Sequence, residues 1–148
     1  MVNDWTVILR LMICFLCGGV IGLEREKKAR SAGLRTHILV CMGSGLIMLV
    51  SLYVFDIYNG KAPVDPSRIA AGVVTGIGFL GAGTIITSRD GAKGLTTAAS
   101  IWVSSAIGLA VGCGFISAAV FTTIITFVTL AFLKHIEKKL EIGEVDNK

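Results

Sequence analysis

Two short motifs match cofactor or redox patterns by letter, and both lie inside apolar runs. The GIGFLG segment at Gly76–Gly81 has the glycine spacing of a dinucleotide-binding loop. That loop, however, requires a preceding strand, a following helix and an acid about twenty residues later, and no βαβ pattern surrounds it here. Cys14 and Cys17 have the Cys-x-x-Cys spacing of redox and zinc sites, but a thiolate needs polar support that an apolar run does not offer. We therefore expect packing cysteines, no metal site, no cofactor and no enzymatic activity.

Polar side chains gather instead beside two basic segments, where they could converge into one site. Ordinary solvation of charges at a membrane edge explains most of these bases. The alternative is a polar cluster built by two tight, facing turns, with Glu24 pairing with an arginine. His37 could ligate a metal, but a single histidine at a helix start is more simply a hydrogen-bonding group. The candidate cluster comprises Glu24, Arg25, Arg35, Thr36, His37, Thr96 and Thr97.

Arg10 is the one formal charge inside a predicted membrane span. It could extend to the outer headgroups, or it could form a buried pair with Asp56 or Asp65 on the same side. We assign Arg10, Asp65 and Arg68 to the outer side.

Composition identifies the elements that must position these residues as membrane-spanning helices. The 148 residues are 53% hydrophobic and only 16% charged, and the mean hydropathy is +0.78, so the surface of the fold faces lipid. The runs are continuously apolar, which favours helices over barrel strands. We expect an all-α, multi-pass protein whose five spans lie near Trp5–Leu23, Thr36–Phe55, Ile69–Thr87, Leu95–Val111 and Phe115–Leu133.

Lysine and arginine predict the orientation of these spans. The segments 24–35 and 88–94 and the tail after Leu133 are rich in bases, whereas the remaining loops carry only Lys61 and Arg68. The basic loops are expected in the cytoplasm, with the N-terminus outside and the C-terminus inside. This bias also accounts for the basic composition without a nucleic-acid partner. We divide the chain into a helical membrane domain, 1–134, and a short cytoplasmic tail, 135–148.

Local signals refine the loops. Glu24 with Lys28 and Glu26 with Arg30 are spaced for i to i+4 ion pairs, so the first helix should continue to Ala32 and stop at Gly33. Asp65-Pro66 predicts a capped start for the third helix.

Glycines at small-xxx-small spacing predict close helix crossings. We expect the third helix to be packed on both faces; the alternative is an interrupted helix whose carbonyl groups line a site. The expected helix-packing glycines are Gly18, Gly22, Gly72, Gly76, Gly78, Gly81 and Gly83.

Four segments in register carry a family resemblance. They are Gly19–Glu26, Ala32–Thr36, Asp65–Gly83 and Gly94–Trp102, and together they resemble the signature of the bacterial MgtC/SapB family. The chain looks like a short form without the soluble C-terminal domain of many members. It departs from the virulence-associated members at Thr96 and Val103.

The resemblance implies a protein of the bacterial cytoplasmic membrane linked to survival under magnesium limitation and, in some pathogens, to virulence. It suggests a non-enzymatic regulator that contacts other membrane proteins through its glycine faces. The rival hypothesis is a small transporter or channel for Mg²⁺ or another ion, acting as a homodimer because five thin helices enclose little volume. No acid lies well inside a predicted span, which gives magnesium transport little support.

The orientation yields a labelling prediction. In a cysteine-free background, a membrane-impermeant thiol reagent should modify a cysteine placed at Asn59 in intact cells. It should modify one placed at Ala92 only after permeabilisation. The reverse pattern would overturn the orientation.

Overall fold

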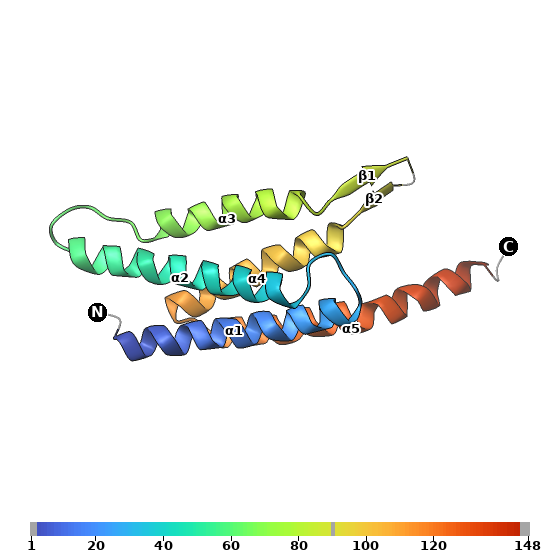
Figure 1. The fold of residues 1–148 in the computed structure, drawn as a ribbon, viewed down its shortest axis with the longest axis horizontal. Helices are drawn as coiled ribbons and strands as arrows, with labels where there is room; N and C mark the ends of the chain where they lie inside the picture. Colours follow the sequence, from blue (N-terminus) through green and yellow to red (C-terminus); the bar gives the residue numbers. More distant parts are fainter. Residues whose placement is uncertain (1–2, 90, 146–148) are drawn as a thin grey trace.

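The protein is a bundle of five helices joined by short connections, in a computed structural model that describes residues 3–89 and 91–145. The helices run back and forth along one axis, so α1 begins and α5 ends at opposite ends of the molecule (Figure 1). A small hairpin of β1 and β2 stands between α3 and α4. The bounds are α1 Asp4–Lys27, α2 Leu34–Tyr58, α3 Ser67–Ala82, β1 Ile86–Ser88, β2 Gly91–Lys93, α4 Leu95–Cys113 and α5 Ile116–Val145.

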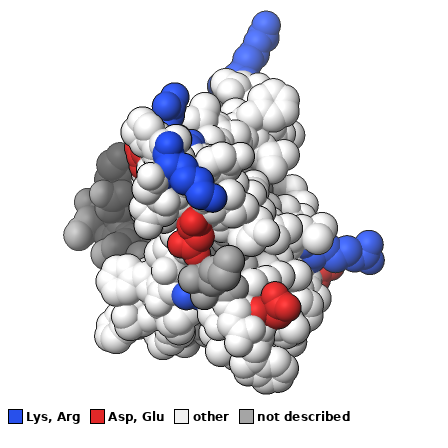
Figure 2. Space-filling model, turned by 90° about the vertical axis from the view of Figure 1, so that its left-hand side faces the viewer, with Lys and Arg blue, Asp and Glu red and all other residues white. Residues whose placement is uncertain are grey.

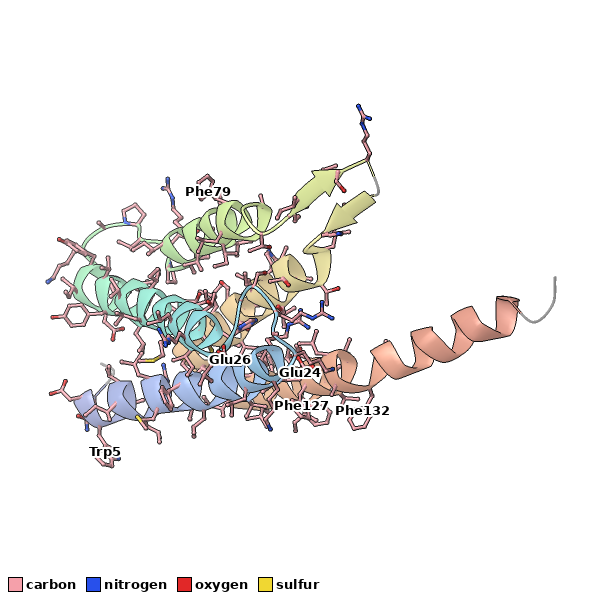
Figure 3. The ribbon with its side chains drawn as sticks, turned by 45° about the vertical axis from the view of Figure 1, so that its right-hand side comes forward. Trp5, Glu24, Glu26, Phe79, Phe127 and Phe132 are labelled. Atoms are coloured by element: carbon pink, nitrogen blue, oxygen red, sulfur yellow. The ribbon has the colours of Figure 1, made fainter. Side chains whose placement is uncertain are left out.

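Helical architecture is confirmed, and four of the helices are long and apolar enough to cross a membrane. These are α1, α2, α4 and the Ile116–Leu133 part of α5. The fifth, α3, has only 16 residues. Large apolar side chains point outward along the bundle: Phe79, 82% exposed, lies on the outer side of α3, and Phe127 and Phe132 lie on α5 (Figure 3). Such an apolar exterior suits lipid rather than water.

The predicted end of the third span at Thr87 is wrong. Helix α3 stops at Ala82, and Ile86 pairs with Lys93 in the antiparallel hairpin. The Thr84 hydroxyl and amide both donate to the Gly81 carbonyl, at 2.8 and 3.0 Å, which closes the last turn. The apolar residues Ile85 and Ile86 made the sequence look like a continuing span, although the glycines of α3 lower its helix propensity.

The predicted end of the first helix is also wrong. Helix α1 ends at Lys27, and Ala29 adopts a left-handed conformation with φ 50°. The amide of Ala29 donates to Glu26 O and that of Arg30 to Arg25 O, the pair of bonds that defines a Schellman motif. The chain therefore reverses four residues before Gly33. At the other end of the bundle, the predicted turn at Gly112–Gly114 closes α4 in the same way, with Gly114 at φ 94°.

The start of α3 has the capping residue that the sequence predicts. Asp65 Oδ1 accepts hydrogen bonds from Ser67 Oγ at 2.7 Å and from Ser67 N at 2.8 Å. These bonds stabilise the ionised carboxylate and hold the pKa of Asp65 below its ordinary value. The helix begins one residue later than Pro66.

Helix α4 is the centre of the bundle, because it packs against α1, α2, α3 and α5. Three of the four cysteines lie in the core beside it: Cys14, Cys17 and Cys41 are buried, whereas Cys113 is exposed. Three cysteines are therefore packing residues, as expected, whereas Cys113 at the end of α4 is not buried.

Glycines on three helices allow backbones to touch. A Cβ added at Gly18 would lie 2.6 Å from His37 O, and one at Gly112 would lie 2.5 Å from Gly45 O. Gly22 and Gly108 also face the backbone of α2. These contacts support the packing role expected of Gly18 and Gly22.

The expectation that α3 is packed on both faces is wrong for the chain taken alone. A Cβ added at Gly72, Gly76 or Gly78 would meet no atom within 4 Å, and one at Gly83 would meet only carbonyl oxygens of its own helix. Gly81 approaches Ala98 of α4 at an ordinary 3.7 Å. Helix α3 buries the Val73, Ile77 and Gly81 stripe and leaves its remaining face open.

This contrast predicts opposite effects of one substitution. Gly108→Ala places a methyl group against the Cys41 carbonyl oxygen and 2.9 Å from Ser44 Cβ, so it should destabilise the protein by about 1–3 kcal/mol. Gly72→Ala meets open space and should stabilise α3 by about 0.5–1 kcal/mol through helix propensity. Unfolding of the purified protein in mixed detergent micelles measures both, and equal responses would contradict the close contact of α2 with α4.

Candidate functional site

An acid and a base are buried side by side in the last turns of α1. Glu24 is 6% exposed and Arg25 is 3% exposed. Lys28 Nζ lies 2.6 Å from Glu24 Oε1, one helical turn away, and Arg25 Nη1 lies 3.8 Å from Glu24 Oε2. Arg25 Nη2 donates to Thr97 Oγ1 of α4 at 3.3 Å. The carboxylate is thus neutralised by two bases, one of which connects α1 to α4.

Lys28 also holds α5. Its ammonium donates to the carbonyl oxygens of Leu130 at 2.7 Å and Ala131 at 3.3 Å. It also forms the ion pair with Glu24, although neither carboxylate oxygen of Glu24 has a hydrogen-bond partner within the described residues. Figure 3 shows Glu24 where the end of α1 meets α5. The i to i+4 pair predicted for Glu24 and Lys28 is therefore present, and through Lys28 it connects α1 to α5.

The second predicted pair does not form. Glu26 Oε2 accepts a hydrogen bond from Leu34 N at 2.9 Å, so this carboxylate caps α2 instead of binding Arg30.

His37 is fully buried between α2 and α4. Its Nδ1 lies 2.8 Å from Gly33 O, and its Nε2 lies 3.0 Å from Ser100 Oγ. Because a carbonyl oxygen can only accept, Nδ1 carries the proton and Nε2 accepts from the Ser100 hydroxyl. That hydroxyl also lies 2.8 Å from Thr97 O and shares its proton between the two acceptors. The histidine is a hydrogen-bonding group, as expected, but it connects two helices below the surface.

Arg35 does not join the cluster, contrary to our expectation. It is exposed, and its side chain has no hydrogen bond or ion pair with the described residues. Arg35 and His37 are two residues apart on α2, about 200° around the helix, so a buried His37 turns Arg35 outward. Thr36 is half-buried and Thr96 is exposed beside the buried Thr97. The structure brings together Glu24, Arg25, Lys28 and Thr97. Ser100 lies one turn further along α4, and His37 of α2 is hydrogen-bonded to it.

Arg10 has a partner that neither of our alternatives named. Its Nη1 donates to Gly112 O at 2.7 Å, at the C-terminal end of α4. The carbonyls at a helix C-terminus carry partial negative charge, and a guanidinium there is favourable. Arg68 and Asp65 are exposed at the same end of the bundle. Figure 2 shows that basic and acidic side chains are interspersed on a mostly uncharged surface at this end.

The sequence analysis missed a buried row of serines on α4. Ser100, Ser104 and Ser105 are at most 3% exposed, and Ser105 Oγ lies 2.9 Å from Ser44 Oγ of α2. Thr97, Ser100, Ser104 and Gly108 follow one another at intervals of three or four residues, which places them on one face of a helix. This spacing could have been recognised in the sequence. Lys28 was expected to pair with Glu24 but was left out of the candidate cluster, because its basic neighbours made it resemble a solvated loop residue.

A cavity of about 510 Å³ opens beside the cluster, between α1, α4 and α5. Among the described residues, three bases line it and no acidic side chain does. Its charged groups are N–H donors, and its threonine hydroxyls can donate or accept, so the lining suits a negatively charged group. Residues that line it include Arg25, Lys28, Arg30, Thr97, Leu130 and Leu133.

The fold and this site define an integral membrane protein of the multi-pass helical class. A family model described as the MgtC family matches residues 11–139. The chain belongs to this family.

Named relatives support the assignment over most of the chain. The "Putative magnesium transporter YhiD" of Escherichia coli (strain K12) is 44% identical over 135 residues, which cover 90% of this chain and 63% of that protein. Protein SrpB of Synechococcus elongatus is 40% identical, covering 92% and 80%. Protein SapB of Bacillus subtilis (strain 168) is 38% identical, covering 98% and 64%. The chain thus spans less than two thirds of the length of YhiD and of SapB. No solved structure matches the chain.

The buried charges yield a stability prediction. Glu24→Gln removes the charge that neutralises Lys28 and the 3% exposed Arg25, so it should destabilise the protein by about 1–3 kcal/mol. Arg35→Gln alters an exposed side chain that has no partner within the described residues, so it should stay within about 0.5 kcal/mol of the unsubstituted chain. Thermal unfolding in detergent compares the two variants. A Glu24→Gln protein as stable as Arg35→Gln would mean that the cluster is solvated.

Proposed function

We propose that the protein regulates other membrane proteins by lateral contact, with the open face of α3 as its docking surface. The observation that carries the proposal is a groove of about 270 Å³ lined by α2 and α3. Gly72 and Gly76 lie in this groove, and a Cβ at either position would meet no atom of the chain within 4 Å. The groove residues are Ile47, Ile69, Gly72, Val73, Gly76 and Ile77.

The chain uses the same glycine spacing three times, with two different results. Gly18 with Gly22, and Gly108 with Gly112, press against α2. Gly72 and Gly76 have identical spacing but no helix against them. In lipid, association depends on close packing of backbones rather than on the hydrophobic effect, and small residues four apart permit it. The occupant that we propose is a transmembrane helix of a partner membrane protein.

Charge argues against a path for Mg²⁺ through the larger cavity. The magnesium in the name of YhiD is a statement about that protein. Here Arg25, Lys28 and Arg30 line the cavity, and three positive charges oppose a divalent cation, which binds to oxygen ligands. A role in adaptation to magnesium limitation, exerted on partner proteins, does not require such a path.

The proposal places the protein in the bacterial cytoplasmic membrane with its C-terminus in the cytoplasm. The two basic connections, between α1 and α2 and between α3 and α4, lie at the same end of the bundle (Figure 1). That end would face the cytoplasm under the positive-inside bias.

Leucine substitutions in the groove test this function. Gly76→Leu should fill the docking surface and abolish growth under magnesium limitation in cells that depend on this protein, at an unchanged protein level. Gly43→Leu is the matched control, because Gly43 of α2 is equally open but lies outside the groove. A photo-crosslinker at Ile69 should capture a membrane protein in the parent chain and lose it in Gly76→Leu.

Three results would contradict the proposal. Normal growth of the Gly76→Leu strain would remove the groove from function. Capture of only a second copy at Ile69 would make the groove a homodimer interface. Mg²⁺ uptake by liposomes that contain only this protein, above the level of protein-free liposomes, would favour a carrier.

A further inference from the structure

We propose that the cavity between α1, α4 and α5 binds a phosphate group. This site is separate from the α3 groove, and the inference goes beyond the proposed function. Cavities that hold small ligands typically measure about 300–1,000 Å³, and this one measures about 510 Å³.

Arg25 is a buried cation whose hydrogen bonds are mostly unmade. Its side chain is 4% exposed, its Nε has no partner within the described residues, and its Nη1 is 3.8 Å from Glu24 Oε2. A guanidinium has five N–H groups, and within the described residues only the bond from Nη2 to Thr97 is formed. Burying unmatched donors on a charged group is costly unless a ligand accepts from them. Because Arg25 lines the cavity, an anion there would satisfy it in the forked geometry that suits phosphate.

The N-terminus of α4 supplies a second set of donors at the same place. Gly94, Leu95, Thr96 and Thr97 all line the cavity, and no side chain caps this helix. The first amides of a 19-residue helix lack intrahelical acceptors and carry partial positive charge, which favours anions. Gly94 takes φ 91°, and a Cβ there would collide with the Thr84 carbonyl, so glycine is required where the chain enters this helix.

The other two bases have different roles. Lys28 donates to the Leu130 and Ala131 carbonyls of α5 and forms an ion pair with Glu24, so its main contribution to the cavity is its charge. Arg30 is exposed at the rim, and its side chain has no hydrogen bond or ion pair in the described part of the chain. It is free to close over a bound anion.

Apolar side chains complete the lining. Leu95, Leu130 and Leu133 line the cavity together with the bases, and Leu95 and Leu133 are exposed to the surroundings of the bundle. A phosphate that enters here would therefore have apolar surface next to it. Both a free phosphate ion and the headgroup of an acidic phospholipid offer the required oxygens, and the experiment separates them.

Two probes test the site in the full chain. The first is inorganic phosphate, titrated against chloride at constant ionic strength while thermal unfolding is followed in detergent. The second is phosphatidic acid in phosphatidylcholine nanodiscs, with bound lipid counted by native mass spectrometry. Saturable stabilisation by phosphate alone would identify the free ion, and retention of phosphatidic acid alone would identify a lipid headgroup. Either result, or both together, supports the site.

Variants connect binding to the cavity. Arg30→Gln removes a rim donor, and Thr96→Asp sets a carboxylate where the anion would lie; each should weaken binding about tenfold or more. An acid in the first turn stabilises the helix, so Thr96→Asp should not impair folding. A loss of binding in this variant would therefore not be due to a loss of folding. Arg35→Gln is the control, an exposed arginine that does not line the cavity. No stabilisation by phosphate together with no retention of phosphatidic acid, or equal weakening by Arg35→Gln, would overturn the inference.

Discussion

Contact between the backbones of α2 and α4 is the interaction on which the remaining structure depends. Gly45, Gly108 and Gly112 let the two helices approach until carbonyl oxygens meet α-carbons. Lipid supplies no hydrophobic force between helices, so close packing and interhelical hydrogen bonds must hold them. The Ser44–Ser105 and His37–Ser100 bonds lie along this contact. Since α4 also touches α1, α3 and α5, its position on α2 sets the places of the others.

The charged cluster follows from that arrangement. Once α4 lies against α2, Thr97 of its first turn faces the end of α1 and receives the hydrogen bond from Arg25. The Schellman turn at Ala29 then brings the chain back at once, and Glu26 caps α2. Buried charges of this kind are weak sources of stability and strong constraints on geometry. Glu24 and Lys28 thus align α1 with α5, while Arg25 keeps donors directed into the cavity.

The sequence predicted what depends on composition and local pattern. Apolar runs identified five helices, and Asp65 and the glycines at the end of α4 marked where two of them begin and end. It failed where tertiary geometry decides. Hydropathy cannot distinguish Ile86 in a hairpin from Ile86 in a helix, and a small-xxx-small pair does not say whether another helix covers it, as Gly18 and Gly72 demonstrate. Arg35 was wrongly placed in the cluster, because the face of α2 on which it lies depends on where that helix starts. The partner of Arg10 was not predicted, because it is a backbone carbonyl, which every residue has.

The shortness of α3 would make docking at the proposed groove depend on the thickness of the membrane. Its 16 residues rise about 24 Å at 1.5 Å per residue, against a hydrocarbon core of about 30 Å. Neighbouring lipid must thin to match, at a cost of fractions of a kcal/mol for each ångström. Helices α1 and α2, with 24 and 25 residues, impose no such deformation, so it is confined to the side of the open glycines. A partner helix docked in the proposed α3 groove would displace the compressed lipid, and a thicker bilayer would strengthen its attachment.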